Sequence, residues 1–326
     1  MDVFNVGIIG AGWIADKMSL TLAGMEDIKV KAIASRDQAK ADAFAKQYGI
    51  EKAYGSYERL VEDPDIDLVY IATPHSHHFE HASLAINAGK PVLCEKAFTA
   101  NVDEAERLIA LADEKKVFLS EAVWTRYMPL SYKVKELIDR GEIGTPRLIS
   151  SSLCYSMVGK ERIMRPDLCG GALLDLGVYC LNFARMYFGG DIASVVSSAE
   201  LFETGTDKYN SMRLTYADGK IADLRSSAIA RCNREGIICG DDGYIVVENI
   251  NCPEALKLYR DYQLVEEFKV PANQITGYEY EVFACREALR EGRLETPQMP
   301  HRETVEIMKM MDSMRAEWGV RFPADK

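Results

Sequence analysis

The chain has 326 residues, of which 48% are hydrophobic, and a formal net charge of −11. This length favours about two domains, each able to bury a core. The acidic balance and the lack of a lysine- or arginine-rich cluster argue against nucleic acid as a partner, because phosphate binding needs a basic surface. Eight scattered cysteines without a CxxC motif favour reduced thiols and a cytoplasmic location.

No basic segment precedes the first apolar strand, so the sequence does not suggest a signal peptide. Residues 172–190 form the longest apolar stretch, but Asp175 and Arg185 interrupt it. Because a membrane span needs about 20 mostly apolar residues, we expect no membrane partner.

The first third of the chain alternates short apolar runs with helical patterns. The runs, expected to be strands, are residues 5–10, 30–35, 67–73, 91–96 and 117–122. The helices between them are expected at residues 13–23, 37–49, 75–89 and 101–116. Runs that are apolar throughout are typical of a parallel sheet with both faces covered. The pattern predicts an α/β protein with a doubly wound Rossmann sheet over residues 1–122.

The pattern changes after about Val123. A helix is expected at residues 130–140, and two more close the chain near 275–291 and 302–318. The strands between them are expected at 146–157, 191–202, 211–227 (a hairpin pair around Ala217-Asp218-Gly219), 243–249 and 255–261. We therefore predict a second, α+β domain over residues 123–326 with a large, mostly antiparallel open sheet.

A glycine-rich loop, Gly10-x-Gly12-x-x-Ala15, follows the first strand and opens the first helix. In a dinucleotide-binding loop the first glycine permits the turn, and the second lets the backbone approach a pyrophosphate at the helix N-terminus. A small third residue allows close helix–strand packing. The loop predicts a nicotinamide cofactor held by Gly10, Gly12, Trp13, Ile14 and Ala15, and a generic glycine turn is the alternative.

The end of the second strand, Ser35-Arg36-Asp37, bears on the choice of cofactor. NAD-binding proteins usually place an acid here, whereas a hydroxyl and a guanidinium suit the 2′-phosphate of NADP. We expect NADP, bound by Ser35 and Arg36, with NAD possible. The alternative is that Arg36 is a solvated residue at the helix start and Asp37 holds the ribose.

Three segments resemble the Gfo/Idh/MocA oxidoreductase family: "GIIGAGWIA", "YIATPHSHHFEHASLAINAGKPVLCEKAFTANVDEAERLI" and "GGALLDLGVYCLNF". The segments "KAYGSYERLVEDPDIDLVYIATPHSHH" and "FLSEAVWTRYMP" are most similar to its branch of dimeric dihydrodiol dehydrogenases and NADP-dependent D-xylose dehydrogenases. The resemblance covers nearly the whole chain. It implies hydride transfer with NAD(P) and a homodimer or higher homo-oligomer formed through the sheet of the second domain.

The resemblance also implies roles for individual residues. Glu95-Lys96-Ala97 matches the family's Glu-Lys-Pro, whose lysine is catalytic or positions the cofactor, and Ala97 replaces the proline. The segment from Asp175 to Tyr179 matches the family's Asp-x-Gly-x-His, with the tyrosine that this branch uses as acid/base. Lys96 and Tyr179 are thus implied to be catalytic.

Further matches are implied to line the cofactor. Thr73-Pro74-His75 stands where the family has Thr-Pro-Asn, and His78 matches the family's histidine in that segment. Trp124 and Arg126 match the branch's Trp-Thr-Arg beside the cofactor. The remaining cofactor contacts are expected from Glu95 and Lys96, and the substrate contacts from Lys96, Trp124, Asp175 and Tyr179.

The pairing of Tyr179 with Lys96 is chemically consistent. Oxidation of an alcohol by hydride transfer needs a base that takes the hydroxyl proton, and reduction needs the same group as an acid. Free tyrosine has a pKa near ~10, and an ammonium group nearby favours its phenolate. We expect the two domains to supply one residue each, with Glu95 orienting the lysine.

Each of these residues also has a purely structural interpretation. Lys96 alone fits a solvated strand end, and Tyr179 fits a helix face packed in a core. Asp175 suits either a substrate hydrogen bond or helix stabilisation, and Trp124 suits either a stacking surface or packing between the domains.

The histidines and cysteines favour no metal site. His77 and His81 lie one helical turn apart, but no carboxylates or thiolates at ligand spacing accompany them. We therefore expect His77 and His81 to be solvated, and Cys94 to be a small buried residue rather than a nucleophile.

The sequence thus predicts a cytoplasmic NADP-dependent oxidoreductase acting on a hydroxyl or carbonyl of a sugar or related polyol. Asp175, Arg126 and His75 are expected to hold the hydroxyls of this small-molecule substrate, with Trp124 as an apolar wall. One alternative is a dehydrogenase of aromatic trans-dihydrodiols. Another is a non-catalytic NADP sensor or scaffold, against which the Lys96–Tyr179 pair argues.

Overall fold

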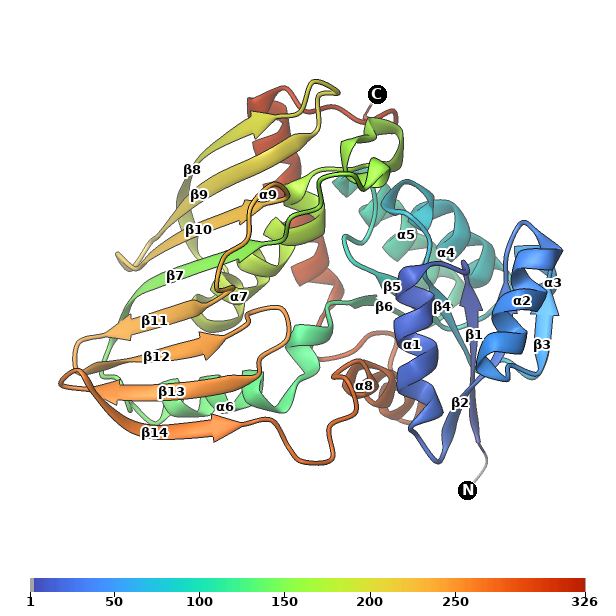
Figure 1. The fold of residues 1–326 in the computed structure, drawn as a ribbon, viewed down its shortest axis with the longest axis horizontal. Coiled ribbons are helices and arrows are strands. Elements are labelled where there is room, and N and C mark those ends of the chain that lie inside the picture. The colour runs from blue at the N-terminus through green and yellow to red at the C-terminus, as the bar shows by residue number, and fades with distance from the viewer. Residues whose placement is uncertain (1–2, 326) are drawn as a thin grey trace. The chain divides into compact units, whose positions relative to one another are not determined.

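The computed structural model describes residues 3–325 and divides the chain into two compact units (Figure 1). The first unit comprises Met1–Val123 and Ile275–Met308, and the second comprises Trp124–Gln274 and Lys309–Lys326. From the sequence, residues 123–326 were expected to form one domain. The structure differs because Ile275–Met308, near the C-terminus, folds with the first unit.

The first unit contains a six-stranded sheet in the order β3-β2-β1-β4-β5-β6, and every neighbouring pair is parallel. Its strands are β1 (Phe4–Ile9), β2 (Ile28–Ala34), β3 (Lys52–Tyr54), β4 (Leu68–Ile71), β5 (Val92–Glu95) and β6 (Leu119–Ala122). Every residue of β4, β5 and β6 is buried, so both faces of the sheet are covered. The predicted doubly wound parallel sheet is confirmed.

The helices of this unit lie between its strands in the chain, except for α8 in the C-terminal segment. They are α1 (Trp13–Ala23), α2 (Gln38–Tyr48), α3 (Tyr57–Val61), α4 (His78–Asn87), α5 (Val102–Lys115) and α8 (Glu279–Arg290). The Asn101 side chain accepts a hydrogen bond from Glu104 N at 3.0 Å and so caps α5 as predicted. Gly49 ends α2 in the left-handed conformation.

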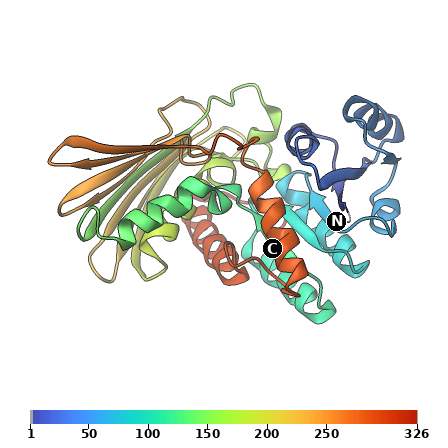
Figure 2. The same ribbon diagram turned by 90° about the horizontal axis from the view of Figure 1, so that it is seen from below.

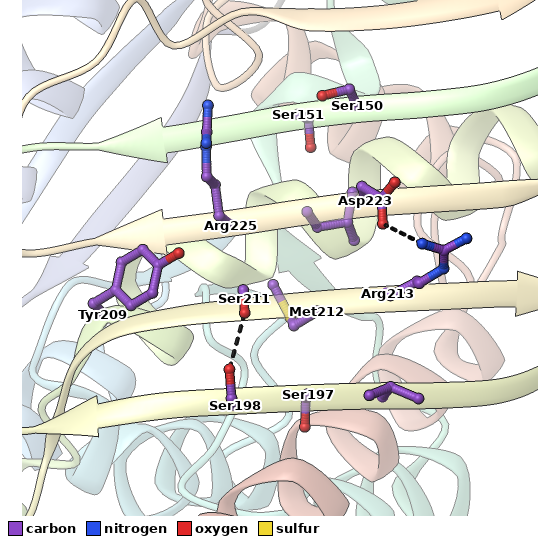
Figure 3. Close-up of a pocket in the computed structure, with 12 residues that line it drawn as sticks. Ser150, Ser151, Ser197, Ser198, Tyr209, Ser211, Met212, Arg213, Asp223 and Arg225 are labelled. Carbon is purple, nitrogen blue, oxygen red and sulfur yellow. Dashed lines mark hydrogen bonds and ion pairs between the residues drawn. The ribbon is translucent and has the colours of Figure 1, made fainter.

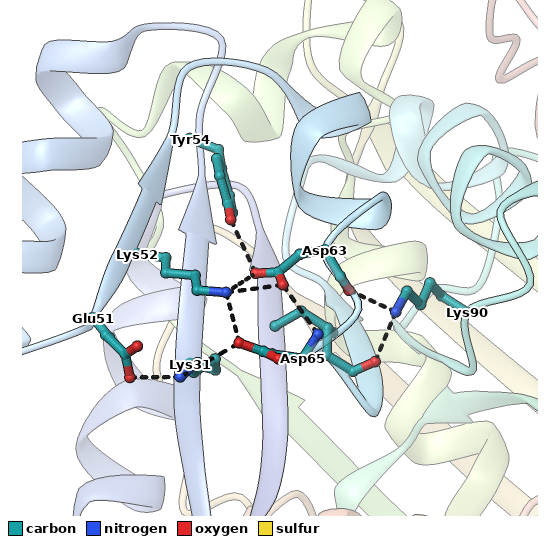
Figure 4. A network of polar contacts seen from close by, with 8 residues as sticks. Lys31, Glu51, Lys52, Tyr54, Asp63, Asp65 and Lys90 are labelled. Atoms are coloured by element: carbon teal, nitrogen blue, oxygen red, sulfur yellow. Dashed lines mark hydrogen bonds and ion pairs between the residues drawn. The ribbon is translucent and has the colours of Figure 1, made fainter.

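The short elements β3 and α3 were not predicted, and a polar network holds the chain around them (Figure 4). Lys52 Nζ lies 2.9 Å from both carboxyl oxygens of Asp63 and 2.8 Å from Asp65. Tyr54 donates to Asp63, and Lys90 Nζ donates to the Asp63 carbonyl at 2.7 Å. The network ties β3 to the loop before β4.

The segment Ile275–Met308 completes the first unit at strand β6. Leu119 N donates to Leu294 O at 2.9 Å, and Ser120 Oγ lies 2.9 Å from Thr296 Oγ1. Thr304 Oγ1 donates to Glu121 Oε2 at 2.8 Å. These contacts supply partners along a strand that would otherwise form an open edge of the sheet.

The second unit contains an eight-stranded sheet in the order β14-β13-β12-β11-β7-β10-β9-β8. Its strands are β7 (Pro146–Cys154), β8 (Ile192–Leu201), β9 (Asp207–Tyr216), β10 (Ile221–Ser227), β11 (Gly236–Gly240), β12 (Gly243–Glu248), β13 (Ala255–Arg260) and β14 (Gln263–Lys269). Only β7 and β10 pair in parallel among the described strands of this sheet. The predicted large, mostly antiparallel sheet is confirmed.

One face of this sheet is covered by helices and the other is open (Figure 2). The helices α6 (Pro129–Asp139) and α7 (Val178–Phe188) pack against β13, β7 and β10. On the open face, Val196 of β8 is 67% exposed. The last helix, α9 (His301–Trp318), runs from the residues of the first unit into those of the second.

The apolar stretch noted in the sequence is a core helix. Pro166–Phe188 is long and apolar enough to cross a membrane by length and composition, but 89% of its most apolar window is buried inside the protein. Every residue of α7 except Met186 and Tyr187 is buried. Packing in the second unit therefore accounts for this hydrophobicity.

Candidate active site

The predicted cofactor residues of the first unit follow four strands. Gly10 comes after β1, Ser35 after β2, Thr73 shortly after β4, and Lys96 directly after β5. Since parallel strands all end at the same edge of a sheet, these residues share its carboxyl edge. The strand order reverses between β1 and β4, which is where ligands bind in open α/β sheets.

The glycine loop has the geometry that a close phosphate approach needs. Gly10 has φ of 102°, and a Cβ there would lie 2.8 Å from Ala72 O, so a side chain is excluded. A Cβ on Gly12 would meet nothing within 4 Å, and no side chain caps α1. Ala15 is fully buried, as the close packing predicted for the third position requires. The residues present therefore fit a dinucleotide pyrophosphate.

At the end of β2, the three candidate residues differ in their contacts. Asp37 accepts from Ala39 N at 2.9 Å and from Lys40 N at 3.3 Å, so its carboxylate caps α2. Ser35 is buried, whereas Arg36 is exposed and lies near the Tyr57 side chain. Because Asp37 serves the helix, Ser35 and Arg36 are the groups that remain for an adenosine ribose or its phosphate.

A buried histidine joins the loops that follow β4 and β5. His78 Nε2 lies 2.8 Å from Thr73 O, and Nδ1 lies 3.0 Å from Ala97 O. Its side chain is fully buried, and burial lowers the pKa of His78 to about 4. The ring thus connects the Thr73-Pro74-His75 turn to the Lys96 loop, and both ring nitrogens face these carbonyls.

His81 is buried, and the expectation that it is solvated is wrong. Its Nδ1 lies 3.0 Å from Thr73 Oγ1, and its ring packs edge-on against Tyr57 at 4.5 Å. Burial lowers the pKa of His81 to about 4. Among residues 3–325, no three histidine, cysteine, aspartate or glutamate side chains gather as metal ligands.

The residue before Lys96 is held firmly in the core. Glu95 accepts from the Tyr70 hydroxyl through Oε1 and from Lys96 N through Oε2, the latter at 3.2 Å. The Lys96–Ala97 peptide bond is cis. Cys94 is fully buried and burial raises the pKa of its thiol, as expected of a small core residue.

The second unit brings the predicted tyrosine and tryptophan into contact. Trp124 Nε1 donates to the Tyr179 hydroxyl at 2.9 Å, and both side chains are buried. Arg126 Nε donates to Asn182 Oδ1 at 2.6 Å. Asn182 lies three residues after Tyr179 on α7 and therefore shares a helix face with it.

Asp175 lies in a π-helical turn, Leu173–Gly177, that leads into α7. Its Oδ2 accepts a hydrogen bond at 2.8 Å from Nη2 of Arg162, a residue in the loop that follows β7. The fully buried Asp207 accepts from Leu173 N and Asn210 Nδ2, each at 2.8 Å, and so fixes the start of that turn. π-Helical turns are frequent at functional sites.

A separate hollow of about 400 Å³ lies on the open sheet face (Figure 3). Its lining comes from β7, β8, β9 and β10 and includes Arg213, Asp223, Arg225 and several serines. Arg213 and Asp223 pair at 3.8 Å across neighbouring strands. No predicted site residue lines this hollow. We therefore treat it as a feature of the open sheet face and not as part of the candidate active site.

Several residues of the site were not found from the sequence. Arg162, Asn182 and Tyr57 each contact a predicted residue but carry no motif of their own. Only Asn182 had a readable signal, because it lies three positions after the tyrosine on one helix.

Comparison with known proteins defines the class. The model of the GFO/IDH/MocA oxidoreductase family with its NAD-binding Rossmann fold matches residues 4–123, and the family's C-terminal domain matches residues 132–246. The chain belongs to this oxidoreductase family, which confirms the resemblance noted in the sequence.

Individual relatives are similar over almost the whole chain. The trans-1,2-dihydrobenzene-1,2-diol dehydrogenase of Danio rerio is 34% identical, covering 98% of both chains. The D-xylose 1-dehydrogenase (NADP(+)) of Hypocrea jecorina is also 34% identical, covering 97% of this chain and 92% of that enzyme. A 3-ketoreductase from Actinomadura kijaniata, solved with NADP and TDP-benzene, has a TM-score of 0.86 at 27% identity, covering 97% of this chain and 98% of the other. These relatives are dehydrogenases and reductases, and the chain is an enzyme of that kind.

Proposed function

We propose that the protein is an NADP-dependent dehydrogenase that oxidises a hydroxyl of a sugar or related polyol, and reduces the corresponding carbonyl. The observation that carries the proposal is the hydrogen bond from Trp124 Nε1 to the Tyr179 hydroxyl. It orients a tyrosine whose helix is otherwise packed in the core, at the position where this branch of the family has its acid/base.

NADP is the cofactor that the residues at the end of β2 favour. Asp37 is engaged as the cap of α2, which leaves Arg36 and Ser35 for the 2′-phosphate. The pyrophosphate would lie on the N-terminus of α1 beside Gly10 and Gly12. When bound, the cofactor accepts or donates the hydride.

Tyr179 is the proposed acid/base. It takes the hydroxyl proton during oxidation and returns it during reduction. The indole N–H of Trp124 stabilises the phenolate by donating to its oxygen, and the Lys96 ammonium adds a favourable charge. Glu95, which accepts from Lys96 N, holds the lysine loop in place.

Asp175 and Arg126 are the proposed partners of the substrate hydroxyls, with His75 beside the cofactor and Trp124 as the apolar wall. Arg162 fixes the Asp175 carboxylate, and Asn182 fixes the Arg126 guanidinium. A polar set backed by an indole suits a ring that has hydroxyls on its edge and an apolar face.

A dehydrogenase of aromatic trans-dihydrodiols is the second candidate. It is supported by the relatives that carry this activity in their names, including the enzyme of Danio rerio. The two candidates share the same proposed chemistry and differ only in the ring that the substrate presents.

A substrate panel with NADP and NAD, followed by nicotinamide absorbance, tests these proposals. We expect turnover with aldoses or polyols and a higher kcat/KM for NADP than for NAD. Faster turnover with a trans-dihydrodiol would favour the second candidate. No turnover with any hydroxyl or carbonyl compound, in a protein that binds NADP, would contradict both and favour a sensor.

Replacement of the acid/base tests the mechanism. Tyr179→Phe is expected to lower kcat by about 10²–10⁴-fold and to leave the Kd for NADP nearly unchanged. Tyr187→Phe is the control, because this hydroxyl lies on the same helix and contacts only Ser131 O, at 3.4 Å, among the contacts described. Equal activity of the two variants would refute the assignment.

We further propose that the enzyme is a cytoplasmic homodimer formed through the open face of the eight-stranded sheet. The exposed apolar side chain of Val196 on β8, opposite the exposed Arg213 of β9, supports this surface. A sheet face with such side chains is typical of an association surface.

A further inference from the structure

Glu281 is a buried carboxyl that the proposed chemistry does not use. It lies in the first turn of α8 and is 0% exposed. Neither of its carboxyl oxygens has a hydrogen-bond partner among residues 3–325. An ionised carboxylate in such surroundings is costly, because nothing replaces the water that it loses.

Glu279, two residues earlier, shows how the same side chain is buried with donors on both of its oxygens. It is also buried, but its oxygens accept from the backbone N–H groups of Ile275, Thr276 and Gly277 at 2.8, 3.1 and 2.7 Å. Three such donors stabilise a negative charge at the beginning of the helix. The two glutamates therefore differ in donors rather than in burial.

Glu95 is the charged group that acts on Glu281 electrostatically. Burial first, and then the negative charge of Glu95, raises the pKa of Glu281 well above its ordinary range. Tyr70 on β4 and Cys285 on α8 are titratable groups that interact with Glu281, and Tyr278, just before α8, interacts with Tyr70. These three are neutral acids when protonated, so none of them compensates a second negative charge.

Two neighbouring carboxyl groups in a core cannot both ionise at moderate pH, because like charges disfavour each other. Glu95 has the donors, namely the Tyr70 hydroxyl and Lys96 N. Glu281 has none among the described residues. The charge therefore belongs on Glu95 and the proton on Glu281.

We propose that Glu281 is a positioning residue of the catalytic loop: it stays a neutral acid at neutral pH, so that it adds no charge that would repel Glu95, and Glu95 keeps its hold on Lys96. Ionisation of Glu281 at high pH places a second negative charge beside Glu95. Repulsion then weakens the Glu95 contact with the loop. The link to catalysis rests on the proposed role of Lys96, whereas the proton on Glu281 does not.

Infrared spectroscopy tests the proton directly. Wild-type protein at pH 7 is expected to show a protonated-carboxyl carbonyl band that Glu281→Gln removes and Glu279→Gln retains. In Glu95→Gln the band is expected to disappear at a lower pH than in the wild type, because the repelling charge is gone. A band that survives in Glu281→Gln would overturn the proposal. So would the absence of the band in the wild type, which is also the result if a bound cation neutralises Glu95 and Glu281.

Thermal unfolding gives an independent readout of the same proton. The folded state holds the proton of Glu281 more tightly than the unfolded state, so the contribution of Glu281 to wild-type stability falls as pH rises above about 4.5. The Tm of Glu281→Gln minus that of the wild type is therefore expected to increase as pH rises from 5 to 8. Glu279→Gln is expected to have a lower Tm throughout, and equal behaviour of the two variants would overturn the proposal.

The pH profile of kcat tests the link to Lys96. The alkaline limb of Glu281→Gln is expected to lie about one pH unit above that of the wild type, and the limb of Glu279→Gln is expected to match the wild type. Coinciding limbs of Glu281→Gln and wild type would refute the positioning role. Failure of the proposed function would appear instead as full activity of Lys96→Met, with the infrared result unaffected.

Discussion

At the scale of single residues, the indole of Trp124 is the direct partner of the proposed acid/base. Trp124→Phe keeps an aromatic ring and removes only the N–H that donates to Tyr179. A hydrogen bond to a charged group is worth roughly 1.5–3 kcal/mol, so kcat is expected to fall about 10–100-fold. Steady-state kinetics measure this loss.

Trp318→Phe is the control for that substitution. Trp318 Nε1 donates to Ser197 Oγ at 3.0 Å, so the variant loses an equivalent bond in the same unit, but not one to Tyr179. Its kcat is expected to stay near the wild-type value. A similar loss in both variants would mean that Trp124 acts only through packing.

Asp207 links the stability of the second unit to pH. Burial raises the pKa of Asp207 to about 6, so the folded state binds its proton more tightly than the unfolded state. Asp207 therefore lowers the free energy of unfolding by up to about 3 kcal/mol as pH rises from about 4 to 6. Urea unfolding at pH 4 and 7 is expected to show a smaller decline for Asp207→Asn than for the wild type. Parallel declines would contradict this expectation.

The residues that were predictable from sequence lie directly after strands. Gly10 and Lys96 each follow an apolar run, and a parallel sheet brings the ends of such runs to one edge. Glu281 and Arg162 were not predictable, because their partners Glu95 and Asp175 are set by tertiary packing that no local pattern encodes. The burial of His81 was missed for the same reason, since its helix packs that face against Tyr57.

At the scale of elements, the cap of α2 separates two explanations for Asp37. If the carboxylate serves only the helix, Asp37→Ala is expected to cost about 1 kcal/mol of stability and to leave the Kd for NADP and NAD unchanged. Urea unfolding and cofactor titration measure both quantities. Weaker cofactor binding without loss of stability would restore Asp37 as the ribose ligand.

Ser56→Ala is the matched control, because Ser56 caps α3 in the same unit through Arg59 N at 3.4 Å. It is expected to lower stability by a smaller amount and to leave cofactor binding unchanged. Capping of α2 thus accounts for Asp37, for which the sequence alone left two roles open.

The elements themselves were predicted well where periodicity was long, and poorly where it was short. The hairpin of β9 and β10 follows its Ala217-Asp218-Gly219 signal. The three residues of β3 and the five of α3 are too short to show a period, and the polar network around Lys52 holds them instead.

At the scale of the whole molecule, the open sheet face is the proposed dimer surface. Val196→Lys places a charge on strand β8 of that face and is expected to convert the dimer to a monomer in sedimentation velocity experiments. Val158→Lys is the control, since Val158 is equally exposed, at 70%, but lies in a loop outside the sheet. Unchanged sedimentation of both variants would refute this surface.

The return of Ile275–Met308 to the first unit has a consequence for biosynthesis. As the chain leaves the ribosome, strand β6 emerges long before Leu294, Thr296 and Thr304, which supply its partners. The nascent N-terminal half therefore spends most of translation with an unprotected strand, which other chains can pair with. Expression of residues 1–123 alone is a poor route to an isolated cofactor domain, whereas a fusion that joins residues 275–308 to it restores the missing contacts.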